Sequence, residues 1–212
     1  MTWHRLTLDE FLESENLLLL DLEYTCWEDS LATDWEDPNR PPEVIEIGLA
    51  SYSPEKHMVA EVYSSYIRPR LNPHLSKYCL NLLNISQDCL DGAPSLAEAL
   101  WSLVPRLNTF ASTGYVTCSW GVRDRLFLAQ DANRVGLVDP FACWAHADIG
   151  CLCRDACAHP ESSGLDRDAM RTLLALQPNK GRHRAMDDAL DLVQFCEWLR
   201  GEAYDENAEC EG

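Results

Sequence analysis

Two acidic residues stand two positions apart at the end of an apolar run. Asp21 and Glu23 follow Leu17–Leu20. Alternate residues of a strand point to one face of a sheet, so both carboxylates are expected to lie together where the strand leaves the core. Burying two such charges side by side is unfavourable unless cations lie between them. The pair therefore indicates a cation site, although a plain strand end would be the ordinary interpretation of the two residues alone.

Further groups of the same chemistry occur much later in the chain, as Asp124, His183 and Asp188. Five residues of regular helix turn through about 500°, which would leave the last two side chains about 140° apart. We therefore expect His183 in a loop that includes Gly181, and Asp188 on the first turns of the final helix. Each of these residues also has an ordinary interpretation, as a helix cap or as an exposed loop histidine.

Together the five residues predict a metal-dependent nuclease. Hydrolysis of a phosphodiester needs a nucleophilic hydroxide, stabilisation of charge on the phosphoryl oxygens and help for the leaving oxygen. Two Mg²⁺ (or Mn²⁺) ions about 3.5–4 Å apart supply all three, and these hard cations prefer carboxylate oxygens. A neutral imidazole beside the attacking water can act as general base near pH 7.

The elements that must position these residues follow from the apolar patterns. Strands concentrated early, then strand and helix alternation, then helices predict an α/β domain with a mixed central sheet. We expect one domain over residues 1–200 and an acidic, disordered tail over residues 201–212. The expected strands are Leu17–Tyr24, Val44–Tyr52, Val59–Ile67 and Tyr115–Trp120. The expected helices are Thr7–Glu13, His74–Leu83, Ser95–Leu107, Arg123–Val135, Asp148–Ala158, Asp166–Leu176 and Met186–Arg200.

The net charge of −18 argues against an extended basic surface for nucleic acid. Much of the acid is concentrated in two segments, with thirteen Asp and Glu in residues 1–50 and five in residues 201–212. A small local binding patch is still expected, because basic residues gather near the proposed site in sequence: Arg68, Arg70, Lys77, Arg123, Arg125, Lys180, Arg182 and Arg184.

The location follows from the apolar runs and the cysteines. No run approaches the roughly 18–20 residues of a membrane span, so we expect no membrane association. The first residues lack the apolar region of a signal peptide, and we expect a cytoplasmic protein whose ten cysteines are mostly reduced. The sequence carries no signal for protein partners or for an oligomeric state.

Four stretches of the chain resemble the DEDDh 3′–5′ exonucleases, a family with the RNase H-like fold. They occur in the family's order and at its separations: Asp21–Glu28, Glu43–Gly48, Ser119–Asp124 and His183–Ala189. Further stretches resemble the Eri-type branch, which includes the histone-mRNA 3′ exonuclease: Thr25–Glu28, Ile67–Cys79 and Ile85–Asp88.

The resemblance implies an enzyme that releases nucleoside 5′-monophosphates from the 3′ end of a single-stranded nucleic acid, with RNA as the expected substrate. By it, Asp21, Glu23, Asp124 and Asp188 bind two metal ions and His183 is the general base. A tyrosine in the base position would indicate the sister DEDDy group. The expected substrate-binding residues are Leu22, Trp120 and Arg123. Arg123 departs from the family, because many members have an aromatic residue before the third acid.

Several alternatives remain open at this stage. The same chemistry could act on DNA or on very short oligonucleotides, which the acidic surface favours, and a non-catalytic binding module is the remaining class. Glu46 inside an apolar strand either supports the metal site or, as alternation favours, faces solvent. Trp27 and Trp35 are expected to pack within their loop, and Trp120 belongs equally well to the core or to the substrate. The residues Cys151, Cys153, Cys157 and His159 match no standard zinc spacing.

Overall fold

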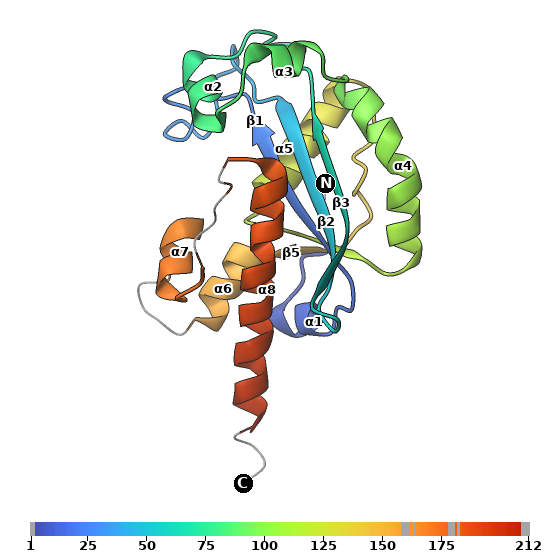
Figure 1. Cartoon of the computed structure of the whole chain (residues 1–212), viewed down its shortest axis with the longest axis vertical. Helices are drawn as coiled ribbons and strands as arrows, with labels where there is room; N and C mark the ends of the chain where they lie inside the picture. The colour runs from blue at the N-terminus through green and yellow to red at the C-terminus, as the bar shows by residue number, and fades with distance from the viewer. Residues whose placement is uncertain (1–2, 158–161, 163, 178–180, 182, 209–212) are drawn as a thin grey trace.

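A five-stranded mixed sheet forms the centre of the structure, in the order β3-β2-β1-β4-β5 (Figure 1). The computed structural model describes residues 3–157, 162, 164–177, 181 and 183–208. Strands β1, β2 and β3 pair antiparallel, and β4 and β5 continue from β1 in parallel. The predicted α/β architecture with a mixed sheet is confirmed. The strands are β1 Leu17–Tyr24, β2 Val44–Ser53, β3 Met58–Tyr66, β4 Val116–Ser119 and β5 His146–Asp148.

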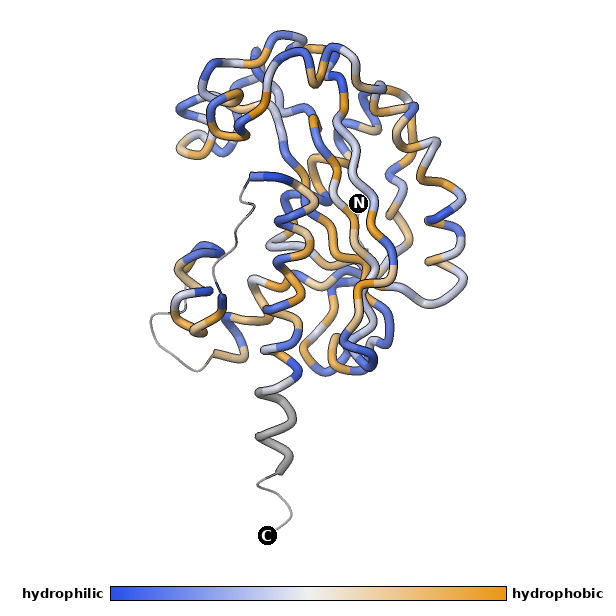
Figure 2. The backbone as a smooth tube through the Cα atoms, in the orientation of Figure 1, coloured by the Kyte–Doolittle hydropathy of each residue, from blue (hydrophilic) through white to orange (hydrophobic). Residues whose placement is uncertain are grey.

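Helices cover both faces of this sheet because the side chains of β1 alternate between two apolar clusters. Leu17 and Leu19 pack with α6, α7 and α8 on one face, and Leu18 and Leu20 pack with α4 and α5 on the other. Figure 2 shows hydrophobic residues concentrated along the central strands. The helices on these faces are α4 Leu96–Ser112, α5 Arg123–Arg134, α6 Ile149–Ala156, α7 Arg167–Leu173 and α8 Ala185–Ala208.

Shorter helices complete the fold at the two ends of the sheet. Helix α1 (Leu8–Leu12) begins with a capping box made by Thr7 and Glu10. Helices α2 (Lys77–Leu83) and α3 (Gln87–Asp91) lie at the opposite end, where they pack a third apolar cluster against β2.

Two elements of the structure were not predicted, and two helices extend well past their predicted ends. Strand β5 has three residues and α3 has five, and both are too short to give a sequence pattern. Helix α4 continues past Pro105 to Ser112, because its apolar stripe extends to Phe110. Helix α8 runs to Ala208, beyond the expected end at Arg200 and into the segment predicted as a tail. Within the described residues, no helix has both the length and the apolar character needed to span a bilayer.

Helix α8 begins in direct contact with β2 at a glycine. Gly48 pairs with Asp21 in the antiparallel register. A Cβ atom at Gly48 would lie 2.2 Å from the carbonyl carbon of Ala185 and 2.4 Å from the amide nitrogen of Met186. Only glycine permits this approach, and it brings the first turn of the last helix beside the end of the first long strand.

Candidate active site

Three carboxylates from opposite ends of the chain converge on one point. Asp21 and Glu23 on β1 and Asp188 on α8 offer oxygen atoms that all lie within 4.8 Å of one another. Asp124, at the start of α5, lines the same pocket as Asp21. Asp21, Asp124 and Asp188 are buried, and Glu23 is half-buried. The prediction that these four residues come together agrees with this geometry.

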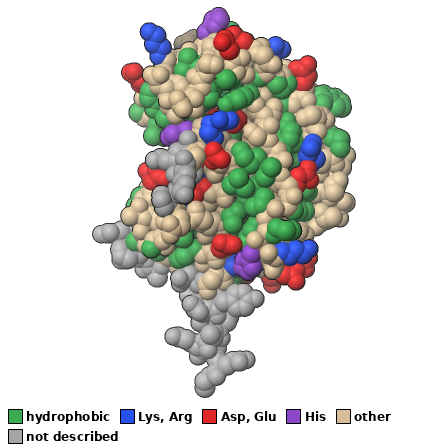
Figure 3. All heavy atoms as spheres, viewed as in Figure 1, with side chains coloured by type: hydrophobic (Ala, Val, Ile, Leu, Met, Phe, Trp, Pro, Cys, Tyr) green, Lys and Arg blue, Asp and Glu red, His purple; other side chains and the backbone are tan. Residues whose placement is uncertain are grey.

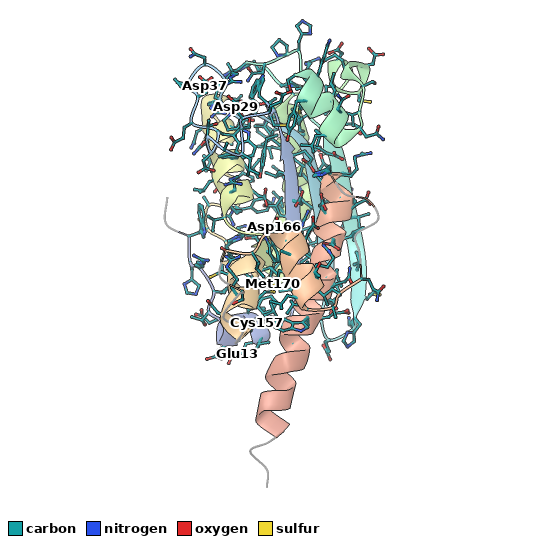
Figure 4. All side chains as sticks on the ribbon, turned by 90° about the vertical axis from the view of Figure 1, so that its left-hand side faces the viewer. Glu13, Asp29, Asp37, Cys157, Asp166 and Met170 are labelled. Carbon is teal, nitrogen blue, oxygen red and sulfur yellow. The ribbon has the colours of Figure 1, made fainter. Side chains whose placement is uncertain are left out.

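The pocket beside this cluster has a volume of about 400 Å³. Its walls come from the end of β1, the start of α5 and the start of α7. Asp166, labelled in Figure 4, lies at the α7 side, where it caps the helix by accepting a hydrogen bond from the amide of Ala169. The lining residues are Asp21, Tyr24, Trp120, Arg123, Asp124, Asp166, Arg167 and Asp168.

The carboxylates of the cluster are held in a setting that disfavours their charge. Burial raises the pKa of Asp21 and of Glu23 well above their ordinary values, and the neighbouring carboxylates raise both further. Burial also raises the pKa of Asp124 to about 7 and raises that of Asp188. Such a group of hard oxygen donors fits divalent cations, which neutralise the charges that the fold brings together.

His183 lies in the loop before α8, as the spacing argument predicts, and Asp188 lies on the first turns of that helix. The backbone amide of His183 donates a hydrogen bond to Oδ2 of Asp188 over 3.0 Å. His183 adopts a left-handed backbone conformation with φ of +61°. This backbone conformation places His183 outside the helix, which begins at Ala185, and next to the carboxylate cluster.

A guanidinium group also reaches the cluster, from the first residue of α7. Nη1 of Arg167 lies 3.2 Å from Oδ1 of Asp21, and Nη2 lies 2.6 Å from Oδ1 of Asp188. This residue was not among those predicted from the sequence. An arginine between Asp166 and Asp168 resembles any solvated helix start, and no local signal distinguishes it.

Glu46 lies next to the carboxylate cluster and is paired with an arginine that precedes α8. It lies opposite Glu23 in the register of β1 and β2 and is 2% exposed. Arg184 donates hydrogen bonds of 3.0–3.2 Å to its carboxylate and lies over the ring of Tyr66. The favoured prediction that Glu46 faces solvent is wrong, because a basic residue near the start of α8 covers it. Its negative charge raises the pKa of Glu23, after the larger effect of burial.

The phenol of Tyr24 contacts Asp124. It donates a hydrogen bond to Oδ1 of Asp124, and this bond partly offsets the effect of burial on the pKa of Asp124. Edge contacts with Phe127 and Trp35 hold the ring of Tyr24. Trp35 in turn donates a hydrogen bond to the carbonyl of Thr25, so this tryptophan packs within its loop as expected.

The three residues expected to bind substrate are placed differently from one another. Leu22 is 3% exposed and belongs to the cluster under α4 and α5, so its side chain points away from the pocket. This orientation follows from strand alternation, because Leu22 lies between Asp21 and Glu23, and the expected contact of Leu22 with substrate stays a prediction.

Trp120 packs against the core and also borders the pocket. Its ring packs against Phe195 with a centroid distance of 4.8 Å, and it also lines the pocket. Arg123 lines the pocket too, with its guanidinium 2.6 Å from Asp34 and 5.2 Å from the ring centre of Trp35. An aromatic ring and a cation therefore lie on the lining of the same pocket.

The cysteine-rich segment does not form a metal site in the described residues. Cys153 is buried in the core under α6 and α8, whereas Cys151 and Cys157 are partly exposed. Within the described part of the chain, the carboxylate cluster is the one group of three or more possible ligands close enough to share an ion. His159, Lys180 and Arg182 lie outside the described residues.

Comparison with known proteins gives a family match over most of the chain. The RNase T exonuclease profile matches residues 18–195, which include the four carboxylates and the loop histidine. This range begins in β1 and ends within α8.

The curated relatives include eukaryotic and bacterial exonucleases. The chain is 25% identical to ERI1 exoribonuclease 3 of Mus musculus over 191 residues, covering 86% of this chain and 52% of that protein. It is 33% identical to 3′-5′ exonuclease eri1 of Schizosaccharomyces pombe over 87 residues, covering 41% of this chain and 27% of that protein. The probable 3′-5′ exonuclease KapD of Bacillus subtilis is 28% identical over 130 residues, which are 61% of this chain and 59% of that one. The chain thus spans about half or less of the length of the first two.

Solved structures share the fold. The nuclease domain of 3′hExo, described as a DEDDh family member bound to rAMP, superposes with a TM-score of 0.74 and 22% identity, covering 92% of this chain and 94% of that domain. A full-length 3′-exonuclease gives a TM-score of 0.76 at 20% identity, covering 90% and 83% of the two chains. The predicted RNase H-like fold is confirmed.

Proposed function

Since this chain belongs to the RNase T exonuclease family, we propose that it is a metal-dependent 3′–5′ exonuclease that releases nucleoside 5′-monophosphates from single-stranded nucleic acid. One observation carries the proposal. Carboxylate oxygens of Asp21, Glu23 and Asp188 lie within 4.8 Å of one another, although 165 positions separate Glu23 from Asp188 in the chain. Divalent cations bound between these carboxylates would offset their mutual repulsion, which explains why the fold buries them together.

In this proposal Asp21, Glu23, Asp124 and Asp188 hold two Mg²⁺ (or Mn²⁺) ions. When bound, such ions stabilise charge on the phosphoryl oxygens and on the leaving 3′ oxygen of an in-line displacement. The protein supplies the ligand oxygens at fixed positions. Tyr24 orients one oxygen of Asp124, and the amide of His183 orients one oxygen of Asp188.

His183 is the proposed general base, taking a proton from the attacking water through its imidazole. Its loop position supports the role, because the backbone amide of His183 donates a hydrogen bond to Asp188 and so holds this residue next to the carboxylate cluster. On the pocket wall, Trp120 presents a ring on which the terminal base could stack, and Arg123 presents a guanidinium for a phosphate.

The proposed substrate is a single-stranded RNA 3′ end. Two similarities support this proposal. Relatives of the chain are named exoribonucleases, and one solved neighbour is described as a 3′-exonuclease in 3′-end specific recognition of the histone mRNA stem-loop. A second candidate substrate is a short oligonucleotide of ribose or deoxyribose. The net charge of −18 favours this candidate. On the face drawn in Figure 3, Lys and Arg side chains are scattered among acidic ones. A short substrate needs few phosphate contacts, so it does not require an extended basic surface.

A variant of one metal-binding residue tests the proposal. Asp188→Asn should abolish Mn²⁺-dependent trimming of a labelled single-stranded RNA, because it removes a charged ligand at the centre of the cluster. Asp187→Asn is the matched control, since the neighbouring aspartate is exposed and should be dispensable. Equal activity of the two variants would refute the assignment.

A substrate panel separates the two candidates. Single-stranded RNA, single-stranded DNA, a stem-loop with a 3′ overhang and a dinucleotide should be compared with Mg²⁺ and with Mn²⁺. Fastest turnover of the long RNA supports the first candidate. Fastest turnover of the dinucleotide, with little difference between ribose and deoxyribose, supports the second.

We also propose a cytoplasmic location. Its support is that the nine cysteines of the described residues are all free thiols, as expected in a reducing compartment.

A further inference from the structure

Arg167 lies between two of the proposed metal-binding carboxylates. Its guanidinium contacts Oδ1 of Asp21 at 3.2 Å and Oδ1 of Asp188 at 2.6 Å, and Nη1 also donates to the backbone carbonyl of Asp188 over 3.4 Å. The arginine side chain is 21% exposed, and the two carboxylates are less exposed still. The guanidinium is thus a cation held at the centre of an acidic cluster.

The guanidinium and a divalent ion would compete for the same carboxylate oxygens. Asp21 and Asp188 both belong to the group of three whose ligand atoms lie within 4.8 Å. An ion bound among these atoms would be placed against a guanidinium that already contacts two of them, and two cations at such a distance repel. Binding of one therefore opposes binding of the other.

We propose that Arg167 is an internal counter-cation that a divalent ion displaces, and that the displaced guanidinium then binds a phosphate of the substrate. This inference rests on the proposed metal site. Its first half follows from competition for shared oxygens, and by linkage the affinity of each cation is reduced by the other. Before metal binds, Arg167 stabilises a cluster whose carboxylates would otherwise repel one another.

The second half follows from where the arginine is anchored. Arg167 is the first residue of α7 and lines the pocket together with Trp120 and Arg123. A guanidinium released from Asp21 and Asp188 remains on this wall, in a mostly buried position where an unpaired charge is costly. A phosphate offers it two oxygens in the planar geometry that arginine prefers.

Calorimetry with Mn²⁺ tests the first half, on protein previously stripped of divalent ions with a chelator. Arg167→Gln should bind Mn²⁺ at least about tenfold more tightly than the unmodified chain, because the competing charge is gone. The stripped variant should also melt at a lower temperature than the stripped unmodified chain. Arg167→Lys should lie between them. Arg106→Gln, which breaks an arginine–glutamate pair on the surface, should change neither quantity.

Steady-state kinetics at saturating Mn²⁺ tests the second half. Arg167→Gln should raise the KM for a single-stranded oligonucleotide. The same substitution should therefore weaken substrate binding while it tightens Mn²⁺ binding. A merely structural arginine would weaken both together.

The outcomes separate this inference from the proposed function. Weaker Mn²⁺ binding by Arg167→Gln would overturn the counter-cation role while leaving the metal site intact. An unchanged KM would overturn the phosphate role. Failure of both the unmodified chain and Arg167→Gln to bind any divalent ion would overturn the proposed metal site, and the inference with it.

Discussion

The phenol oxygen of Tyr24 and the carboxylate of Asp124 are joined by a hydrogen bond across 100 residues of chain. The bond connects the end of β1 to the first turn of α5, so the two strand-end acids and the helix acid are fixed relative to one another. Tyr24 contacts the pocket as well, and its ring is held by Phe127 and Trp35. The aromatic group therefore positions a carboxylate without itself offering a charge.

Tyr24→Phe should lower kcat by about tenfold or more, since a hydrogen bond to a charged group contributes about 1.5–3 kcal/mol. The ring contacts remain, so the fold should be retained and circular dichroism should be unchanged. Tyr63→Phe is the matched control, because its hydroxyl bonds Ser102 on the surface, away from the pocket. If the two variants trim substrate at the same rate, Tyr24 does not position Asp124.

Gly48→Ala should destabilise the protein and reduce metal binding. The added methyl would meet the backbone of Ala185 at 2.2 Å, so the start of α8 must move, and Asp188 with it. Overpacking of this kind costs about 1–3 kcal/mol, and a rigid backbone neighbour places it at the upper end. Chemical denaturation and Mn²⁺ calorimetry measure the two effects. Gly92→Ala should be nearly neutral, since the nearest atom lies 3.8 Å away.

Arg184→Met should destabilise the protein by about 2 kcal/mol, because it leaves Glu46 buried without its partner. Arg184 is itself partly exposed, so water offsets some of the loss. The double variant with Glu46→Gln should recover most of the stability, since the unpaired charge is then gone. Denaturant unfolding of the two single variants and the double variant gives the coupling directly. Additive losses would show that the pair contributes no stability of its own.

The stability of metal-stripped protein should fall as the pH rises. The folded-state pKa of Asp124 is about 7, and those of Asp21 and Glu23 are also raised, so the folded state binds more protons than the unfolded state. Their contribution is complete below the ordinary carboxyl pKa and is lost as pH rises through the raised values. His146, whose pKa burial lowers to about 4, acts in the opposite sense only below its ordinary value of 6.5.

Melting temperatures measured between about pH 6.5 and 8.5 isolate the carboxylate effect. They should decline with pH in the presence of chelator, and Asp124→Asn should reduce the slope. Added Mn²⁺ should raise the melting temperature most at the highest pH, because metal ligands must be deprotonated. A flat profile with chelator would show that the cluster does not bind extra protons in the folded state.

The acidic residues of the site could be predicted because each has a local signal. Strand alternation places Asp21 and Glu23 on one face, and the helix angle excludes His183 from the helix that carries Asp188. The same alternation, applied to Leu22, would have excluded its side chain from the pocket. The sheet and most helices followed from apolar patterns that span whole elements.

The groups that surround the acids could not be predicted, because they meet only through tertiary packing. Arg167 reaches Asp21 across 146 residues, and Arg184 reaches Glu46 across 138. Both stand in polar surroundings in the sequence, where an arginine is ordinarily solvated. Glu46 in an apolar strand was the one visible anomaly, and its partner lay in a stretch with several basic residues.

The contact between Gly48 and Ala185 also makes the proposed metal site depend on the docking of the last helix. During synthesis the acids of β1 emerge early, whereas Asp188 follows only when the last helix leaves the ribosome. A nascent chain therefore carries three of the four proposed metal-binding carboxylates, and the proposed metal site is complete only once the final helix has docked against β2.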